Sequence, residues 1–230
     1  MKKPVFYTEI AYFLGLVLLA CGTALTAYGG FGISMVVAPA YILHLYLSQF
    51  WSFFSFGVAE YLLQGIVLLL LVLILKKAKI TYLLSFLVTL FYGLCLDEAM
   101  SLTALLPANI YLQVAAYVVG AIICCNALAL LFCSYLPPEA YELFSKEIAA
   151  KIHKPVHLVV NFYNLGSLLI AAILSLTFFG KFQGIGIGTV VCAFLYGFVI
   201  RFFQKIYNKL FRFTDKFSLR KHFEEREVPQ

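Results

Sequence analysis

The sequence predicts an all-α integral membrane protein whose six transmembrane helices form two inverted three-helix repeats. Hydrophobic residues make up 63% of the 230 residues and charged residues only 12%, whereas roughly a quarter of an ordinary soluble domain is charged. The charged residues are clustered, so that residues 10–59 and 99–138 contain none. The order of segments also repeats after about 104 residues, the separation of Tyr92-Gly93 from Tyr196-Gly197.

Six apolar segments are long enough to span a bilayer, which takes about 20 helical residues. They are residues 10–28, 53–75, 80–96, 109–136, 155–179 and 184–207. Residues 33–50 are also apolar but include Pro39 and His44. This segment is either a seventh span or one that enters the membrane and returns on the same side.

The distribution of basic residues favours six spans. With the N-terminus inside, every Lys and Arg except Lys181 falls on the cytoplasmic face, as the positive-inside rule requires. A seventh span would move the basic cluster at 76–79 to the opposite face. We therefore expect a multi-pass protein of the cell (plasma) membrane with both termini in the cytoplasm. The same bias accounts for the net charge of +6 without nucleic acid.

The repeat supports the same topology. It aligns 33–50 with 137–154, which contains Glu139, Glu142 and Lys146 and cannot span. Three spans per repeat give the halves opposite orientations. We expect repeats at 1–106 and 107–207, each with an extra re-entrant or interfacial segment. For 137–154 we expect an interfacial helix that begins after Pro137-Pro138.

The tail at 208–230 is basic, and apolar residues recur at helical spacing from Phe203 to Phe217. This pattern predicts an amphipathic helix on the anionic inner leaflet. A solvated helix end and a binding segment for a cytosolic partner are the alternatives.

Polar residues inside the spans are the candidate functional residues, because they are costly in lipid. Glu60 lies well inside its span, and Gln64 follows one turn later on the same face. Burial favours the protonated form of a carboxyl group, which fits proton coupling; a purely structural hydrogen bond is the alternative. The repeat aligns Glu60 with Asn164, which shares a helix face with Asn161 and follows Tyr163.

The paired segments 33–50 and 137–154 also indicate a site, because interrupted segments at matching places often line one. The first contributes Ser34 and His44. The second carries Glu139, Tyr141 and Glu142, for which we expect a structural role. The predicted substrate-binding residues are thus Glu60, Gln64, Asn161, Asn164, Tyr163, Ser34 and His44.

Motifs for enzymatic chemistry are missing from the sequence. There is no GxSxG, HExxH or Walker motif, and the six cysteines lack metal-ligand spacing. GIGIG at 184–188 is not a dinucleotide motif and suits close helix packing. We expect no enzyme activity, cofactor or metal.

Two stretches resemble a known family. YGGFGISMVVAPAYIL and AAILSLTFFGKFQGIGIGTVVCAFLYGFVIRFFQK are similar to the bacterial YczE/YitT-like membrane proteins, and the resemblance extends to about Tyr207. It implies a multi-spanning membrane protein and no particular substrate.

Three functions remain open from the sequence. The first is a small-molecule permease with a central site between the halves, with or without coupling to protons. The second is a substrate-binding subunit of an ATP-driven transporter, which would co-purify with an ATPase. The third is a scaffold or sensor that acts through its tail. The small-residue faces fit either a homo-oligomer or a partner subunit.

Overall fold

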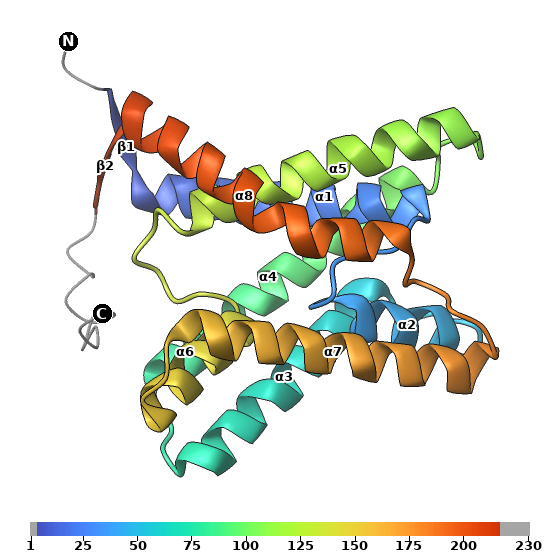
Figure 1. Cartoon of the computed structure of the whole chain (residues 1–230), viewed down its shortest axis with the longest axis horizontal. Coiled ribbons are helices and arrows are strands. Elements are labelled where there is room, and N and C mark those ends of the chain that lie inside the picture. The colour runs from blue at the N-terminus through green and yellow to red at the C-terminus, as the bar shows by residue number, and fades with distance from the viewer. Residues whose placement is uncertain (1–3, 217–230) are drawn as a thin grey trace.

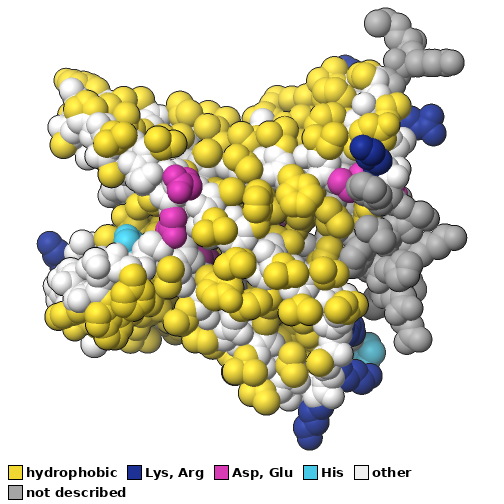
Figure 2. All heavy atoms as spheres, turned by 180° about the vertical axis from the view of Figure 1, so that it is seen from behind, with side chains coloured by type: hydrophobic (Ala, Val, Ile, Leu, Met, Phe, Trp, Pro, Cys, Tyr) yellow, Lys and Arg dark blue, Asp and Glu magenta, His cyan; other side chains and the backbone are white. Residues whose placement is uncertain are grey.

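The computed structural model describes residues 4–216, which form eight helices and two short strands. Six of these helices are long and apolar enough to cross a membrane: α1 (Thr8–Gly29), α3 (Phe56–Leu75), α4 (Ile80–Thr103), α5 (Ile110–Leu131), α7 (Val156–Phe179) and α8 (Ile187–Leu210). Large apolar side chains stay exposed on their outer faces, and Figure 2 shows hydrophobic side chains over most of the face seen from behind. The chain is a multi-pass α-helical membrane protein, as predicted.

Two of the predicted spans end elsewhere. α4 continues through Asp97 and Glu98 to Thr103, because the Asp97 carboxylate is bound by the start of α3 and does not need to leave the helix bundle. α5 ends at Leu131, short of the predicted residue 136. The chain then runs without regular structure to Pro138, and both prolines of this segment keep it from continuing as a helix.

The helices form two groups (Figure 1). α1, α5 and α8 pack together in one, and α3, α7 and the two short helices α2 (Ala38–Leu47) and α6 (Ala140–Ile152) form the other. α4 joins the groups, since it packs on α1 and on α3.

The most extensive helix pair is α1 with α5, which run antiparallel. Gly22 and Gly120 allow their backbones to approach, because a Cβ on either glycine would lie 2.8 Å from the carbonyl oxygen of the other. Small residues permit this kind of contact in membranes, where dispersion forces drive helix association. The pair forms the rigid centre of the first group.

The short helices α2 and α6 both lie between α3 and α7. Ala140, Tyr141, Leu143 and Ala149 of α6 are buried there. The interfacial placement predicted for 137–154 is therefore wrong: α6 packs as a half-helix within the bundle, although it begins directly after Pro137, Pro138 and Glu139 as expected. Its charges are compensated locally, because Lys79 pairs with Glu147 at 2.6 Å and Lys151 donates to the Ile74 carbonyl at 2.8 Å.

The N-terminal ends of α2 and α6 approach the same level of the bundle. On α3, the Phe56 ring packs against Tyr41 of α2, while Glu60, one turn later, bonds to α6. On α7, Ser167 donates to the Val36 carbonyl just before α2, while Tyr163, one turn earlier, packs against α6. One helical turn is about 5.4 Å, so the two half-helices begin close together.

The first and last described segments meet at the end of the molecule that also holds the α3–α4 and α6–α7 connections (Figure 1). Strand β1 (Val5–Tyr7) pairs in parallel with β2 (Arg212–Thr214). The buried Glu9 carboxylate accepts the Tyr135 hydroxyl at 2.7 Å and the Lys216 N–H at 3.0 Å. The helix predicted through Phe217 is wrong here: α8 stops at Leu210, and the following residues form the strand because β1 supplies its hydrogen-bond partners. The rest of the predicted tail, residues 217–230, lies outside the described residues.

Candidate functional site

Helix α3 carries Glu60 and Gln64 toward α6. Ser55 caps this helix by accepting the Val58 N–H at 3.1 Å, which satisfies one of the free donors of the first turn. Residues 60, 64, 68 and 71 follow helical spacing and are all buried. The polar pair thus continues an apolar face that packs on the half-helix.

Glu60 is fully buried, with 0% of its surface exposed. Its Oε2 accepts the Tyr141 hydroxyl at 2.9 Å and the Gln64 side-chain amide at 3.3 Å. Its Oε1 has no hydrogen-bond partner within residues 4–216. A buried charge without a partner is costly, so this carboxyl group needs either a proton or a bound cation.

Gln64 links three helices. Its side-chain oxygen accepts the Thr89 hydroxyl of α4 at 2.7 Å and the Ala140 N–H at the start of α6 at 3.2 Å. The side-chain amide of Gln64 also donates to Glu60 at 3.3 Å. Gln64 therefore holds the Glu60 carboxyl group next to the start of α6, which Glu139 directly precedes.

Glu139 is the residue that precedes α6. The segment before it is held by its carbonyl groups, since Tyr12 donates to Pro137 O at 2.6 Å and Ser85 donates to Pro138 O at 2.7 Å. Glu139 Oε1 is buried and has no hydrogen-bond partner in the described part of the chain. Burial, reinforced by the negative charges of Glu142 and Glu60, raises the pKa of Glu139 to about 8.

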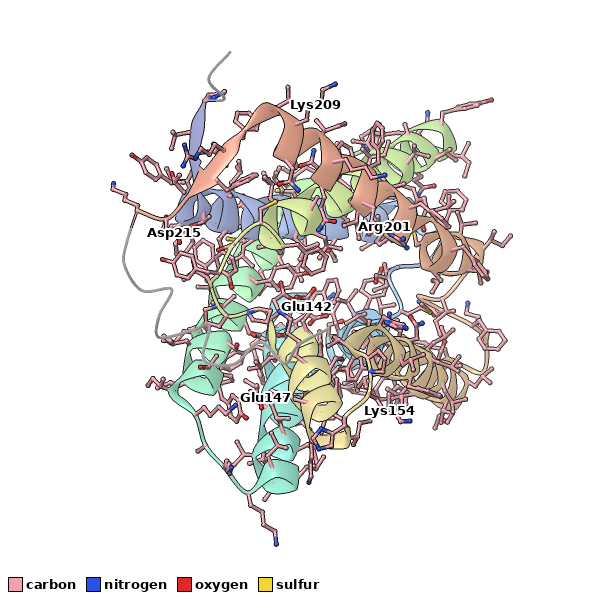
Figure 3. The ribbon with its side chains drawn as sticks, turned by 60° about the vertical axis from the view of Figure 1, so that its left-hand side comes forward. Glu142, Glu147, Lys154, Arg201, Lys209 and Asp215 are labelled. Atoms are coloured by element: carbon pink, nitrogen blue, oxygen red, sulfur yellow. The ribbon has the colours of Figure 1, made fainter. Side chains whose placement is uncertain are left out.

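Glu142, in the first turn of α6, is held differently. Burial raises its pKa, but the nearby Lys146 ammonium opposes that shift. Figure 3 shows Glu142 at the end of α6 that faces the middle of the molecule, with Glu147 and Lys154 farther along toward the α6–α7 connection. Glu142 thus has a compensating charge that Glu139 lacks.

Of the residues predicted for the site, three lie close together: Glu60, Gln64 and Tyr163. The Tyr163 ring is 5.8 Å from the Tyr141 ring that bonds to Glu60. Asn164 is half-buried and Asn161 is exposed on α7. Their participation stays a prediction.

Ser34 and His44 lie on the α2 side of the meeting point. Ser34 precedes α2, and its carbonyl accepts the Ala38 N–H at 3.0 Å. His44 Nδ1 lies 2.9 Å from the Phe54 carbonyl oxygen, and its ring stacks on Phe56. Among the described residues, neither Ser34 nor His44 contacts the Glu60 carboxyl group.

Sequence reasoning assigned Glu139 and Tyr141 a structural role, yet both contact the buried polar cluster. The available signal was the sequence Pro-Pro-Glu at the start of a short segment that the repeat pairs with another. It was outweighed by the charges that follow, which suggested a helix at the surface. The candidate site therefore consists of Glu60, Gln64, Thr89, Glu139 and Tyr141.

A family model described as a family of unknown function, DUF6198, matches residues 6–205. The chain belongs to this family. No curated protein and no solved structure matches the chain. The matched range of this DUF6198 protein includes the first five spans, α8 up to residue 205 and both half-helices.

The chemistry open to the DUF6198 site is the binding of positive charge. Its two orphan oxygen atoms both belong to carboxyl groups, and its hydroxyl and amide donors already serve other acceptors. Residues 4–216 contain no group of three His, Cys, Asp or Glu side chains able to hold a metal ion. A proton or a monovalent cation fits this arrangement better than a divalent metal.

Proposed function

We propose that this protein is a small-molecule permease driven by an ion gradient, with its central site where α2 and α6 meet between α3 and α7. The observation that carries the proposal is the fully buried Glu60 carboxyl group, whose Oε1 has no partner among the described residues. Ionisable groups inside membrane bundles are costly, and they commonly serve ion or substrate pathways. The role is transport without enzymatic chemistry.

The helix contacts support an inverted repeat of α1–α4 and α5–α8. α1 packs on α4 as α5 packs on α8, α2 packs on α3 as α6 packs on α7, and α2 packs on α7 as α6 packs on α3. α1 and α5 pair with each other. This is the pattern that a pseudo-two-fold axis produces, and transporters with such repeats bind substrate near it.

Individual side chains support the same axis. Tyr92 of α4 donates to Thr23 of α1 at 3.2 Å. Tyr196, at the matching place on α8, lies beside Cys124 of α5. The pair Tyr92-Gly93 and the pair Tyr196-Gly197 thus anchor their helices in equivalent ways.

The halves differ in the contacts of α4 and α8, which suits alternating access. α4 packs on α3 in the first half, whereas α7 and α8 have no comparable contact in the second. Gly93 lies against Gly57, but Gly197 meets only its own helix's Arg201, whose Nη2 would be 3.9 Å from a Cβ. We propose that one half is closed and the other open, and that transport exchanges these two arrangements.

The positive-inside rule supports a cytoplasmic location for both termini of this DUF6198 protein in the plasma membrane. Figure 2 shows basic side chains mainly toward the end of the molecule that holds β1 and β2. The resemblance to YczE/YitT-like proteins fits the same assignment, and the basic tail fits contact with anionic lipid.

The test is Glu60→Gln, which keeps the shape of the side chain and an oxygen that can accept from Tyr141. Purified protein would be screened by thermal shift against a panel of metabolites, and each hit assayed for uptake into proteoliposomes under an imposed pH gradient. We expect normal folding, with gradient-driven uptake reduced by ~10²–10⁴-fold, the range by which removal of one essential proton-transfer group slows a reaction.

The control is Glu147→Gln, which removes only the exposed ion pair with Lys79 and should leave uptake unchanged. Unchanged uptake by the Glu60→Gln protein would remove Glu60 from the mechanism. Co-purification with an ATPase would instead favour a substrate-binding subunit of an ATP-driven transporter.

A further inference from the structure

We propose that Glu60 and Glu139 together form one coupling-ion site, which binds a single positive charge shared between the two carboxyl groups. This inference rests on the permease function and deepens it, because it assigns the second half of the ion site to Glu139 on the other repeat. The bound charge is a proton or a small monovalent metal ion such as Na⁺.

The geometry supports one shared site rather than two separate ones. Gln64 donates to Glu60 and accepts the N–H of Ala140, the residue directly after Glu139, and each carboxyl group has a buried oxygen without a partner within residues 4–216. Two carboxyl groups this close cannot both be ionised in a dry interior unless a positive charge lies between them. Their protons then belong to the pair and not to either residue.

The surroundings supply no fixed positive charge to take that role. Titratable groups face the pair from every packed helix, and apart from Lys146 they are phenols or carboxyls: Tyr12 from α1, Tyr92 from α4, Tyr141 and Glu142 from α6, and Tyr163 from α7. The Lys146 ammonium acts on Glu142. Glu60 and Glu139 are therefore left to an exchangeable ion.

The backbone next to Glu139 is unwound, as at the ion sites of transporters with broken helices. The segment before α6 is not helical, and its Pro137 and Pro138 carbonyl groups point at side chains of α1 and α4. In transporters with broken helices, unwound carbonyl groups of this kind coordinate Na⁺ or lie beside the proton site. Since Glu139 directly precedes α6, ion binding would act directly on the half-helix that touches α3 and α7.

The pair predicts a pH-dependent stability. The folded-state pKa of Glu139, about 8, lies above its ordinary value of 4.5. Between these values the folded protein holds more protons than the unfolded chain, so stability should fall as pH rises through about 8 and level off above it. Glu139→Gln cannot lose a proton at this position and should remove most of that fall.

The experiment measures the melting temperature of full-length protein in detergent from pH 5 to pH 10, in NaCl or in N-methylglucamine chloride. We expect Glu60→Gln and Glu139→Gln each to remove most of the wild-type pH dependence. The control, Glu147→Gln, alters an acid farther along the same half-helix that pairs with Lys79, and should keep the wild-type response to pH. If Na⁺ stabilises wild type at pH 9 and neither single variant, the shared charge is Na⁺; an equal fall in both salts identifies a proton.

The proposal is overturned if Glu139→Gln shows the wild-type response to pH and to Na⁺. In that case, loss of gradient-driven uptake in Glu60→Gln would still support the permease, with Glu60 acting alone. Double replacement provides the final check: one shared charge predicts that the double variant shows no larger change than either single variant, whereas additive changes contradict sharing.

Discussion

Replacing Gly57 by Ala should destabilise the protein more than any other single methyl group added to the spans near the site. A Cβ at this position would collide with the carbonyl oxygen of Gly93 and lie 2.6 Å from Asp97 Oδ2. Overpacking of this kind costs about 1–3 kcal/mol, and the upper end applies because the Gly93 backbone cannot rotate away. The melting temperature in detergent measures the loss.

Gly166→Ala is the matched control. Gly166 lies in α7, and a Cβ there would meet nothing within 4 Å. Since Ala forms helices better than Gly by about 1 kcal/mol, this variant should melt at the same temperature as wild type or slightly higher. Equal melting temperatures for Gly57→Ala and wild type would show that α3 and α4 can separate at no cost, and would contradict the closed contact.

The sequence was sufficient to predict the six spans, because hydrophobic length and the clustering of charges follow directly from the bilayer. It was not sufficient for α6. The charges Lys146, Glu147 and Lys151 predict a surface helix when only the segment itself is considered. In the folded chain Lys79 pairs with Glu147, and the Ile74 carbonyl accepts a hydrogen bond from Lys151. These partners lie 68 and 77 residues away along the chain. Pairwise contacts over such distances cannot be inferred from local pattern.

The candidate site shows the same division. Glu60 and Gln64 could be predicted because polar residues one turn apart in an apolar helix must face a common partner. Glu139 could not be assigned to the site, since its position depends on how Tyr12 and Ser85 hold the two prolines before it. The end of the tail helix also depended on a distant partner, because β1 at the other terminus determines where strand β2 replaces helix.

Asp97→Ala should release the start of α3 from α4. The Asp97 carboxylate accepts the Ser55 hydroxyl at 2.6 Å and the Gly57 N–H at 2.7 Å, and hydrogen bonds to charged groups contribute about 1.5–3 kcal/mol each. We expect a fall in melting temperature comparable to that of Gly57→Ala. Hydrogen–deuterium exchange should accelerate at the first turn of α3, because the Gly57 N–H loses its acceptor. Asp97→Asn, which keeps one acceptor but no charge, should have a melting temperature between those of Asp97→Ala and wild type.

Glu98→Ala is the control for Asp97, since it removes the neighbouring acid, whose residue is exposed. This variant should exchange and melt like wild type, and an equal effect in both variants would point to general loss of acidic charge. Because α8 lacks the contact with α7 that α4 makes with α3, loss of the Asp97 bonds should make the first half resemble the second. Under alternating access, loss of the Asp97 bonds should then also open the path to Glu60. Hydrogen–deuterium exchange would rise both at the first turn of α3 and around Gln64. Faster exchange confined to the first turn would separate the two effects and show that Asp97 stabilises a helix end without gating the site.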